Sequence, residues 1–121
     1  MYEDALKKRE YKISAFQLHQ SAEAAYKSIL LVFTEYCPGE HFLCLLGEMA
    51  VVHNVRIADI FPGDTQEHSQ LFDLLDYAYI GARYDPKYNI TKEQLEYLAA
   101  RVKKLLELTE KICKEKIESF V

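Results

Sequence analysis

The stretch ARYDPKYN, at residues 82–89, holds the side chains best suited to bind a phosphate group. Arg83 falls at the end of a predicted helix, and a planar guanidinium matches the geometry of a phosphate. Two other roles are open for this arginine: it would also stabilise the end of the helix dipole, or pair with Asp85. Nearby tyrosines could stack on bases, form part of a dimer interface, or lie at the edge of a helical bundle with their hydroxyls in water. They are Tyr77, Tyr79, Tyr84 and Tyr88.

A second group of polar side chains has helical spacing. His19 lies four residues before Glu23, which lies four residues before Lys27, so the three stack along one face of a helix. Such a face could line a groove for a nucleotide or RNA. Because Glu-to-Lys pairs at this spacing are common on exposed helices, we expect a solvated ladder here and keep the groove as the alternative.

Side chains for metal or covalent chemistry are present without their usual spacing. Cys37, His41 and Cys44 are ligand types that zinc accepts, yet they form no Cys-x2-Cys pair and lack a fourth ligand nearby. Asp73 and Asp76 share a predicted helix and are expected to face solvent rather than form an acid/base pair. We therefore predict no metal site, no cofactor and no catalytic residue.

Hydrophobic periodicity and proline breaks predict helices throughout the chain. A short helix is expected at about residues 4–9, and longer ones at about 12–36, 42–53, 65–83 and from Thr91 over roughly 28 residues. Prolines interrupt the pattern at CPG (37–39), FPGD (61–64) and YDPKYN (84–89). We predict one all-α domain over residues 1–121, an antiparallel up-and-down bundle of four main helices plus the short N-terminal helix, with the two longest helices adjacent.

Composition narrows the class of protein. The chain has 121 residues, half of them hydrophobic, which suits one compact domain. Its net charge of −4 supplies no overall positive potential that would attract nucleic acid or an anionic membrane. Its three cysteines fit a reducing compartment better than a disulfide framework. The N-terminus has no signal-peptide core, and no apolar run is long enough to span a membrane. These features favour a cytoplasmic protein.

Three stretches in this order resemble the HEPN domain family: SAFQLHQSAEAAYKSILLVFTEYCPGEH, LLDYAYIGARYDPKY and YNITKEQLEYLAARVKKLLELTEKICKEKIESF. The resemblance rests on the pattern A-x-x-x-H-Q-x-x-E-x-x-x-K, on CPGEH with Glu40 in place of a threonine and His41 retained, and on ARY closing a helix. It covers about residues 12–120. It is closest to bacterial HEPN domains that follow, or are paired with, a minimal nucleotidyltransferase. The chain would then be a separate partner protein or the C-terminal part of a longer nucleotidyltransferase-HEPN protein.

The resemblance implies a helical bundle that usually forms a homodimer. Many family members are metal-independent ribonucleases, with an arginine followed after four to six residues by a histidine. Counted from Arg83, the positions for that histidine hold Tyr88, Asn89 and Ile90. Asn89 donates hydrogen bonds but is no base near neutral pH. The ribonuclease histidine is therefore missing, and we expect no enzyme activity from the domain alone.

These observations predict a non-nuclease, dimerising HEPN-like module that binds a nucleotide or assists a nucleotidyltransferase domain in the same chain or in a separate protein. The candidate nucleotide-binding residues are Arg83, Tyr84, Lys27, Glu23, His41 and Asn89. Two alternatives stay open: a toxin-like, metal-independent ribonuclease in which His41 replaces the missing histidine, and a purely structural dimerisation domain. A nucleotide or RNA is the expected ligand class.

Overall fold

The chain folds into helices joined by short connections. The computed structural model describes residues 2–120, with side chains described from residue 7 onward. Within this range the α-helices are α1 at Tyr2–Thr34, α2 at Leu43–Val51, α3 at Gln66–Tyr84 and α4 at Lys92–Glu118, and a 3-10 helix, η1, covers Val55–Asp59. The described residues contain no strand, so the predicted all-α helical bundle is confirmed.

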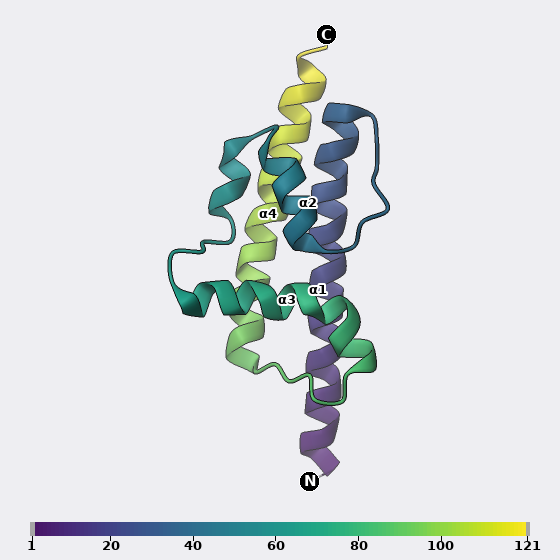
Figure 1. Cartoon of the computed structure of the whole chain (residues 1–121), viewed down its shortest axis with the longest axis vertical. Coiled ribbons are helices and arrows are strands. Elements are labelled where there is room, and N and C mark those ends of the chain that lie inside the picture. The colour runs from purple at the N-terminus through teal and green to yellow at the C-terminus, as the bar shows by residue number, and fades with distance from the viewer. Residues whose placement is uncertain (1, 121) are drawn as a thin grey trace.

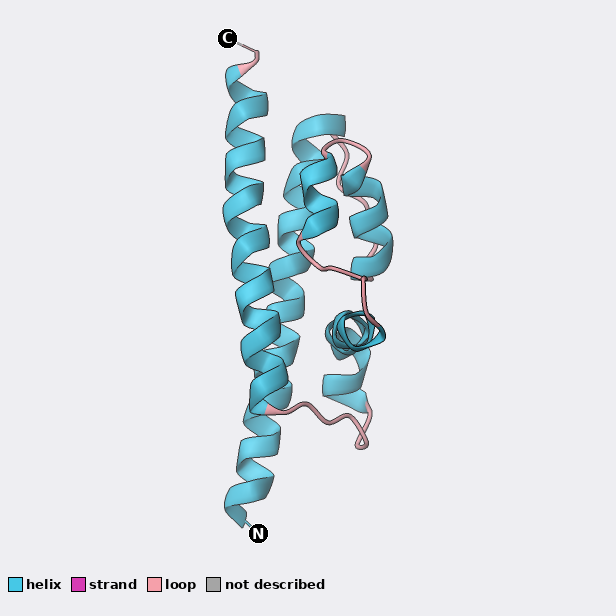
Figure 2. Ribbon diagram, turned by 90° about the vertical axis from the view of Figure 1, so that its left-hand side faces the viewer, coloured by secondary structure: helices cyan, strands magenta, loops and turns pink. Residues whose placement is uncertain are grey.

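The two longest helices form one layer of the molecule. α1 and α4 lie side by side along the long axis (Figure 1), and α2, η1 and α3 cover one side of that pair (Figure 2). Near the C-terminal ends of the long helices, the Lys116 ammonium lies 5.2 Å from the centre of the Phe33 ring. The expectation that the longest helices are neighbours is therefore confirmed.

The helix directions differ from the antiparallel up-and-down order that we expected. α1 and α4 start at the same end of the molecule and run in the same direction, while α3 crosses both (Figure 1). Residues 35–42 run back along α1, which brings His41 to Glu23. α2 then returns in the direction of α1, so that the His53 ring lies 5.2 Å from the Phe33 ring. The connections on either side of α2 and the crossing of α3 return the chain to the end where α1 began.

The ends of α1 also differ from the expectation. The separate helix predicted at residues 4–9 is continuous with the next one, since neither glycine nor proline interrupts the chain before Thr34. α1 ends two residues earlier than predicted. Glu35 takes a left-handed conformation with φ of 60°, the helix-ending geometry that glycine usually supplies.

The N-terminal ends of α3 and α4 are set by local sequence, as predicted. The Thr65 hydroxyl accepts a hydrogen bond from the His68 amide. Thr91 forms a complete capping box with Gln94, in which each side chain bonds the other residue's amide. One face of α4, on which buried side chains recur every three or four residues, is in the core along its whole length, at Leu95, Leu98, Val102, Leu105, Thr109 and Ile112.

Candidate functional site

Aromatic rings surround the guanidinium of Arg83 at the end of α3. Its central carbon lies 4.6 Å from the ring centre of Tyr79, 4.8 Å from that of Phe16 and 4.9 Å from that of Tyr84. Its Nε donates a 2.8 Å hydrogen bond to the Tyr79 carbonyl, one turn back on the same helix. This contact satisfies a carbonyl of the last turn, as the helix-dipole alternative describes. The rings restrict the arginine while its side chain stays exposed.

The charge of Arg83 is not neutralised within the described part of the chain. None of the described carboxylates lies within ion-pair distance of it. The alternative of an Arg83–Asp85 pair is wrong, because Asp85 accepts instead from the Tyr77 hydroxyl at 3.0 Å and from the Lys87 amide at 2.9 Å. These two bonds, with the Lys87 amide first, lower the pKa of Asp85. The guanidinium is therefore available to an anion.

His41 joins the arginine to the polar face of α1. Its ring stacks on Tyr79, with centres 4.6 Å apart and planes 11° from parallel. Its Nδ1 lies 3.2 Å from Glu23 Oε1. A carboxylate only accepts hydrogen bonds, so this nitrogen carries the proton and Nε2 is left with its lone pair when the ring is neutral. Tyr79 thus contacts both His41 and Arg83, from α3.

The polar face of α1 is not the solvated ladder that we expected. His19 is fully buried, and Glu23 and Lys27 are only 17% and 18% exposed. The Lys27 ammonium lies 3.2 Å from the second Glu23 oxygen. The connection through His41 and the crossing helix α3 cover this face, which spacing along α1 alone does not reveal. The face is therefore covered by neighbouring segments rather than solvated.

His19 is a buried ring without a hydrogen-bond partner. Its Nδ1 lies 3.9 Å from Glu23 Oε1 and its Nε2 lies 3.7 Å from Asp76 Oδ1, and neither nitrogen is hydrogen-bonded among the described groups. Unsatisfied buried polar atoms cost about 1–3 kcal/mol each, so native structures seldom keep them without a reason. His19 stands between the two carboxylates that organise this region.

Asp76, which lies on α3, caps the N-terminal end of α2. Its carboxylate accepts from the Leu43 amide at 2.6 Å and from the Cys44 amide at 3.2 Å. α2 begins after Phe42, whose side chain cannot cap, so its first amides need an acceptor from elsewhere. Our prediction that Asp76 faces solvent is therefore wrong: its side chain is 14% exposed. Asp73, one turn earlier, is exposed as predicted.

The predicted site residues fall into one connected group and one outlier. Glu23 contacts both Lys27 and His41, Tyr79 connects His41 to Arg83, and Arg83 lies over the Tyr84 ring. Asn89 is exposed and lines a different groove, together with lysines such as Lys12 and Lys87.

The list of candidate binding residues omitted four members of this site: Phe16, which the sequence did not single out, and His19, Asp76 and Tyr79, which it noted but did not select. A usable signal was present in their spacing. Phe16, His19 and Glu23 are separated by three and four residues, and so are Asp76, Tyr79 and Arg83. Each set lies on one face of its helix, and the two faces meet.

Two of the three positions at which ribonuclease members carry a histidine are used for packing here, and the third, Asn89, is exposed. Tyr88 is 6% exposed, and its hydroxyl donates a 2.9 Å bond to the Leu74 carbonyl. Ile90 is 2% exposed. A histidine at either position would enter the core rather than face Arg83.

No metal centre is formed by the described residues. Among them, no group of three or more His, Cys, Asp or Glu side chains is placed to hold an ion. Cys37 and Cys44 are exposed free thiols rather than zinc ligands. Likewise, none of the helices described here has the length and hydrophobicity needed to cross a membrane.

The fold and site define an all-α helical bundle with an arginine, histidine and carboxylate cluster between its first and third helices. The family model for the HEPN domain matches residues 2–112, nearly the whole chain. The chain therefore belongs to the HEPN domain family, as its motifs indicated. A comparison with curated proteins gave no match.

Proposed function

We propose that this domain is a non-nuclease HEPN module that forms a homodimer, binds a nucleotide beside Arg83, and assists a nucleotidyltransferase domain in the same chain or in a separate protein. The observation that carries the nucleotide proposal is the state of Arg83. Rings hold its guanidinium in place, and no described carboxylate neutralises it. Because the guanidinium is already held in place, little side-chain freedom is lost when it binds a phosphate.

The surrounding side chains match the other parts of a nucleotide. Tyr84 is 72% exposed and offers a ring face on which a base can stack. Glu23 is an acceptor for ribose hydroxyl groups, and Lys27 adds a positive charge beside it. His41 lies between these groups and Tyr79. Asn89 contributes at most to the edge of this site, because it lies in a different groove.

The absence of a histidine at the three motif positions supports binding rather than cleavage. HEPN domains commonly dimerise, and a dimer would place two copies of the Arg83 site in one assembly. A nucleotide held there by one protein could be presented to a nucleotidyltransferase. Family resemblance alone supports that last step.

Calorimetric titration tests the nucleotide proposal. ATP, GTP, their non-hydrolysable analogues and a short RNA are titrated into the wild-type dimer fraction, into Arg83→Ala and into Arg101→Ala. Arg101 is the matched control, since its guanidinium also lies over a ring, 5.5 Å from the centre of Tyr97. Hydrogen bonds to charged groups contribute about 1.5–3 kcal/mol, so Arg83→Ala should weaken binding by about tenfold to a hundredfold.

The control separates local from general effects. Arg101→Ala should bind like the wild type, and both variants should keep the wild-type helicity by circular dichroism. Equal affinity of Arg83→Ala and wild type would remove Arg83 from the site. A stable dimer that binds none of these ligands would favour the purely structural dimerisation domain.

One observation favours a ribonuclease as the second candidate. His41 is paired with Glu23, which leaves Nε2 of the neutral ring as a base, and the Tyr79 ring joins it to Arg83. RNA cleavage measured with EDTA present tests this candidate, because the chemistry needs no metal. Cleavage that is lost in His41→Gln but kept in His68→Gln would establish it. No cleavage by the wild-type dimer would exclude it.

A further inference from the structure

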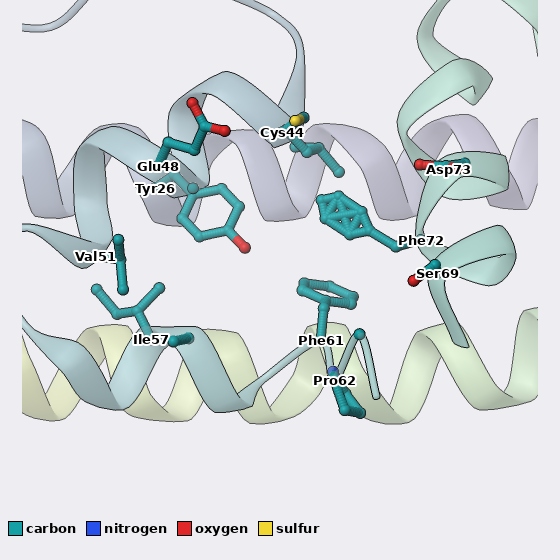
Figure 3. Close-up of a pocket in the computed structure, with 14 residues that line it drawn as sticks. Tyr26, Cys44, Glu48, Val51, Ile57, Phe61, Pro62, Ser69, Phe72 and Asp73 are labelled. Atoms are coloured by element: carbon teal, nitrogen blue, oxygen red, sulfur yellow. The ribbon is translucent and has the colours of Figure 1, made fainter. Parts of the chain in front are cut away.

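A cavity of about 320 Å³ lies between α1, α2, the segment around η1 and α3, away from the Arg83 site. Its floor includes the buried side chains of Tyr26 and Ile57. Phe61 and Phe72 form part of its wall, packed edge to face with ring centres 4.9 Å apart. The three aromatic rings lie around a common space (Figure 3). This size and lining are typical of small-molecule sites in proteins.

The hydroxyl of Tyr26 is a polar group that lines this cavity. The residue is only 3% exposed, and its hydroxyl makes none of the hydrogen bonds found among the described groups, while the oxygen itself is not among the fully buried unsatisfied atoms. Figure 3 shows the ring projecting into the cavity from α1. Gly47 on α2 leaves room above it, since a Cβ there would lie 3.5 Å from the hydroxyl oxygen. An unpartnered hydroxyl that points into a cavity is a ready partner for a polar group of a ligand.

The charges at the rim are of one sign. Glu48 on α2 and Asp73 on α3 both line the cavity with exposed side chains, and no Lys or Arg lines it. Neither carboxylate is in an ion pair with the described basic groups. Burial, followed by the carboxylates of Glu48, Asp76 and Asp73, raises the pKa of the Cys44 thiol at the same rim. The field at the mouth is therefore negative and would attract a cation.

From the unpartnered Tyr26 hydroxyl, the aromatic wall and the carboxylates of Glu48 and Asp73, we infer that this cavity binds a small organic ammonium ion with an apolar body. The body fills the space between Phe61, Phe72 and Ile57, where burial of apolar surface stabilises it. The ammonium group lies toward the two carboxylates and is attracted by the ring faces. The Tyr26 oxygen accepts a hydrogen bond from the ligand's polar end. This site is separate from the nucleotide site and does not depend on it.

Three matched probes test the charge requirement: 2-phenylethylammonium, neutral 2-phenylethanol and anionic 3-phenylpropionate. Each is titrated into the ¹⁵N-labelled protein, and amide shifts are followed by NMR. We expect the ammonium probe to shift amides of Cys44, Gly47 and Gly63, and to bind about tenfold more tightly than the alcohol. The carboxylate should bind least. Equal affinities for all three probes, or no shift at these amides at saturating probe, would overturn the inference.

Side-chain variants then locate the ligand. An exposed ion pair contributes up to about 1 kcal/mol, so Glu48→Gln and Asp73→Asn should each weaken the ammonium probe by up to about fivefold and leave the alcohol unchanged. Tyr26→Phe keeps the ring and removes the hydroxyl, and it should weaken both probes. Glu107→Gln, an exposed change on α4, should alter neither. Unchanged ammonium affinity in the Glu48→Gln, Asp73→Asn double variant would refute the assignment, as would a loss of equal size in Glu107→Gln.

Discussion

The same change, glycine to alanine, should have opposite effects at two helical positions of this protein. At Gly81 on α3, an added Cβ would lie 2.6 and 2.7 Å from ring carbons of Tyr77 and 2.7 Å from a ring carbon of Tyr88. At Gly47 on α2, the nearest atoms belong to Tyr26 and lie at 3.5 Å. Carbon atoms in favourable contact are about 3.5–4.0 Å apart, so only the first position is overfilled.

The expected magnitudes follow from these distances. Alanine is favoured over glycine within a helix by about 0.8–1 kcal/mol, and this gain applies at both positions. Tyr77 is 42% exposed and can swing outward with the loss only of an exposed hydrogen bond to Asp85, whereas Tyr88 is buried and bonded to the Leu74 carbonyl. Moving its ring costs about 1–3 kcal/mol for overpacking and about 1 kcal/mol for the hydrogen bond. Gly81→Ala should therefore lose about 1–3 kcal/mol, while Gly47→Ala gains about 0.5–1 kcal/mol.

Urea unfolding followed by circular dichroism at 222 nm measures both changes in the free energy of unfolding. The midpoint should fall for Gly81→Ala and rise slightly for Gly47→Ala, with little change in the slope. Gly81→Ala should also weaken nucleotide binding, because Arg83 lies in the last turn of α3, next to the 85–90 turn that would move. A Gly81→Ala variant at least as stable as the wild type would refute this account of the packing between α3 and the 85–90 turn.

Two further predictions concern the groups that hold this region together. Asp76→Ala leaves the first amides of α2 without their acceptor, so it should lower the free energy of unfolding by about 2–3 kcal/mol. Asp73→Asn, the control, should change it by under about 0.5 kcal/mol. Equal losses in the two variants would contradict the capping role of Asp76. Burial raises the pKa of Tyr88 from its ordinary value of 10.0, so the unfolded chain releases this proton at lower pH than the folded one. Stability supplied by the neutral hydroxyl is complete below pH 10 and is lost as pH rises further, by at most about 1.4 kcal/mol per pH unit. Tyr88→Phe should be about 1 kcal/mol less stable than the wild type at pH 7, yet its free energy of unfolding should fall less steeply above pH 10. Parallel urea titrations of both proteins between about pH 9 and 11.5 measure this difference. A wild-type free energy of unfolding that rises with pH over this range would contradict the prediction.

Much of the local structure followed from the order of residues alone. Periodic apolar positions identified the helices and the whole buried face of α4, because a helix repeats every 3.6 residues whatever packs against it. Thr65 and Thr91 marked helix starts, since a cap acts on amides only two or three residues away. On α1 periodicity is a poorer guide to burial: Ile13, one of its periodic apolar residues, is 49% exposed.

The candidate site was only half visible in the sequence. Spacing grouped Glu23 with Lys27, and the nature of the side chains selected Arg83 and His41. Spacing does not say what covers a face, however, so His19 was placed on a solvated ladder although it is fully buried.

Tertiary structure decided the rest, because it depends on the direction of each connection. The segment 35–42 turns back along α1 and brings His41 to Glu23. The crossing of α3 brings Asp76 to the beginning of α2 and Tyr79 to His41. These contacts join residues that are eighteen or more positions apart in the chain, and local periodicity carries no information at that range. The sequence thus determined the helices and the chemistry available on them, and the packing of α3 and the 35–42 connection on α1 determined which side chains form one site.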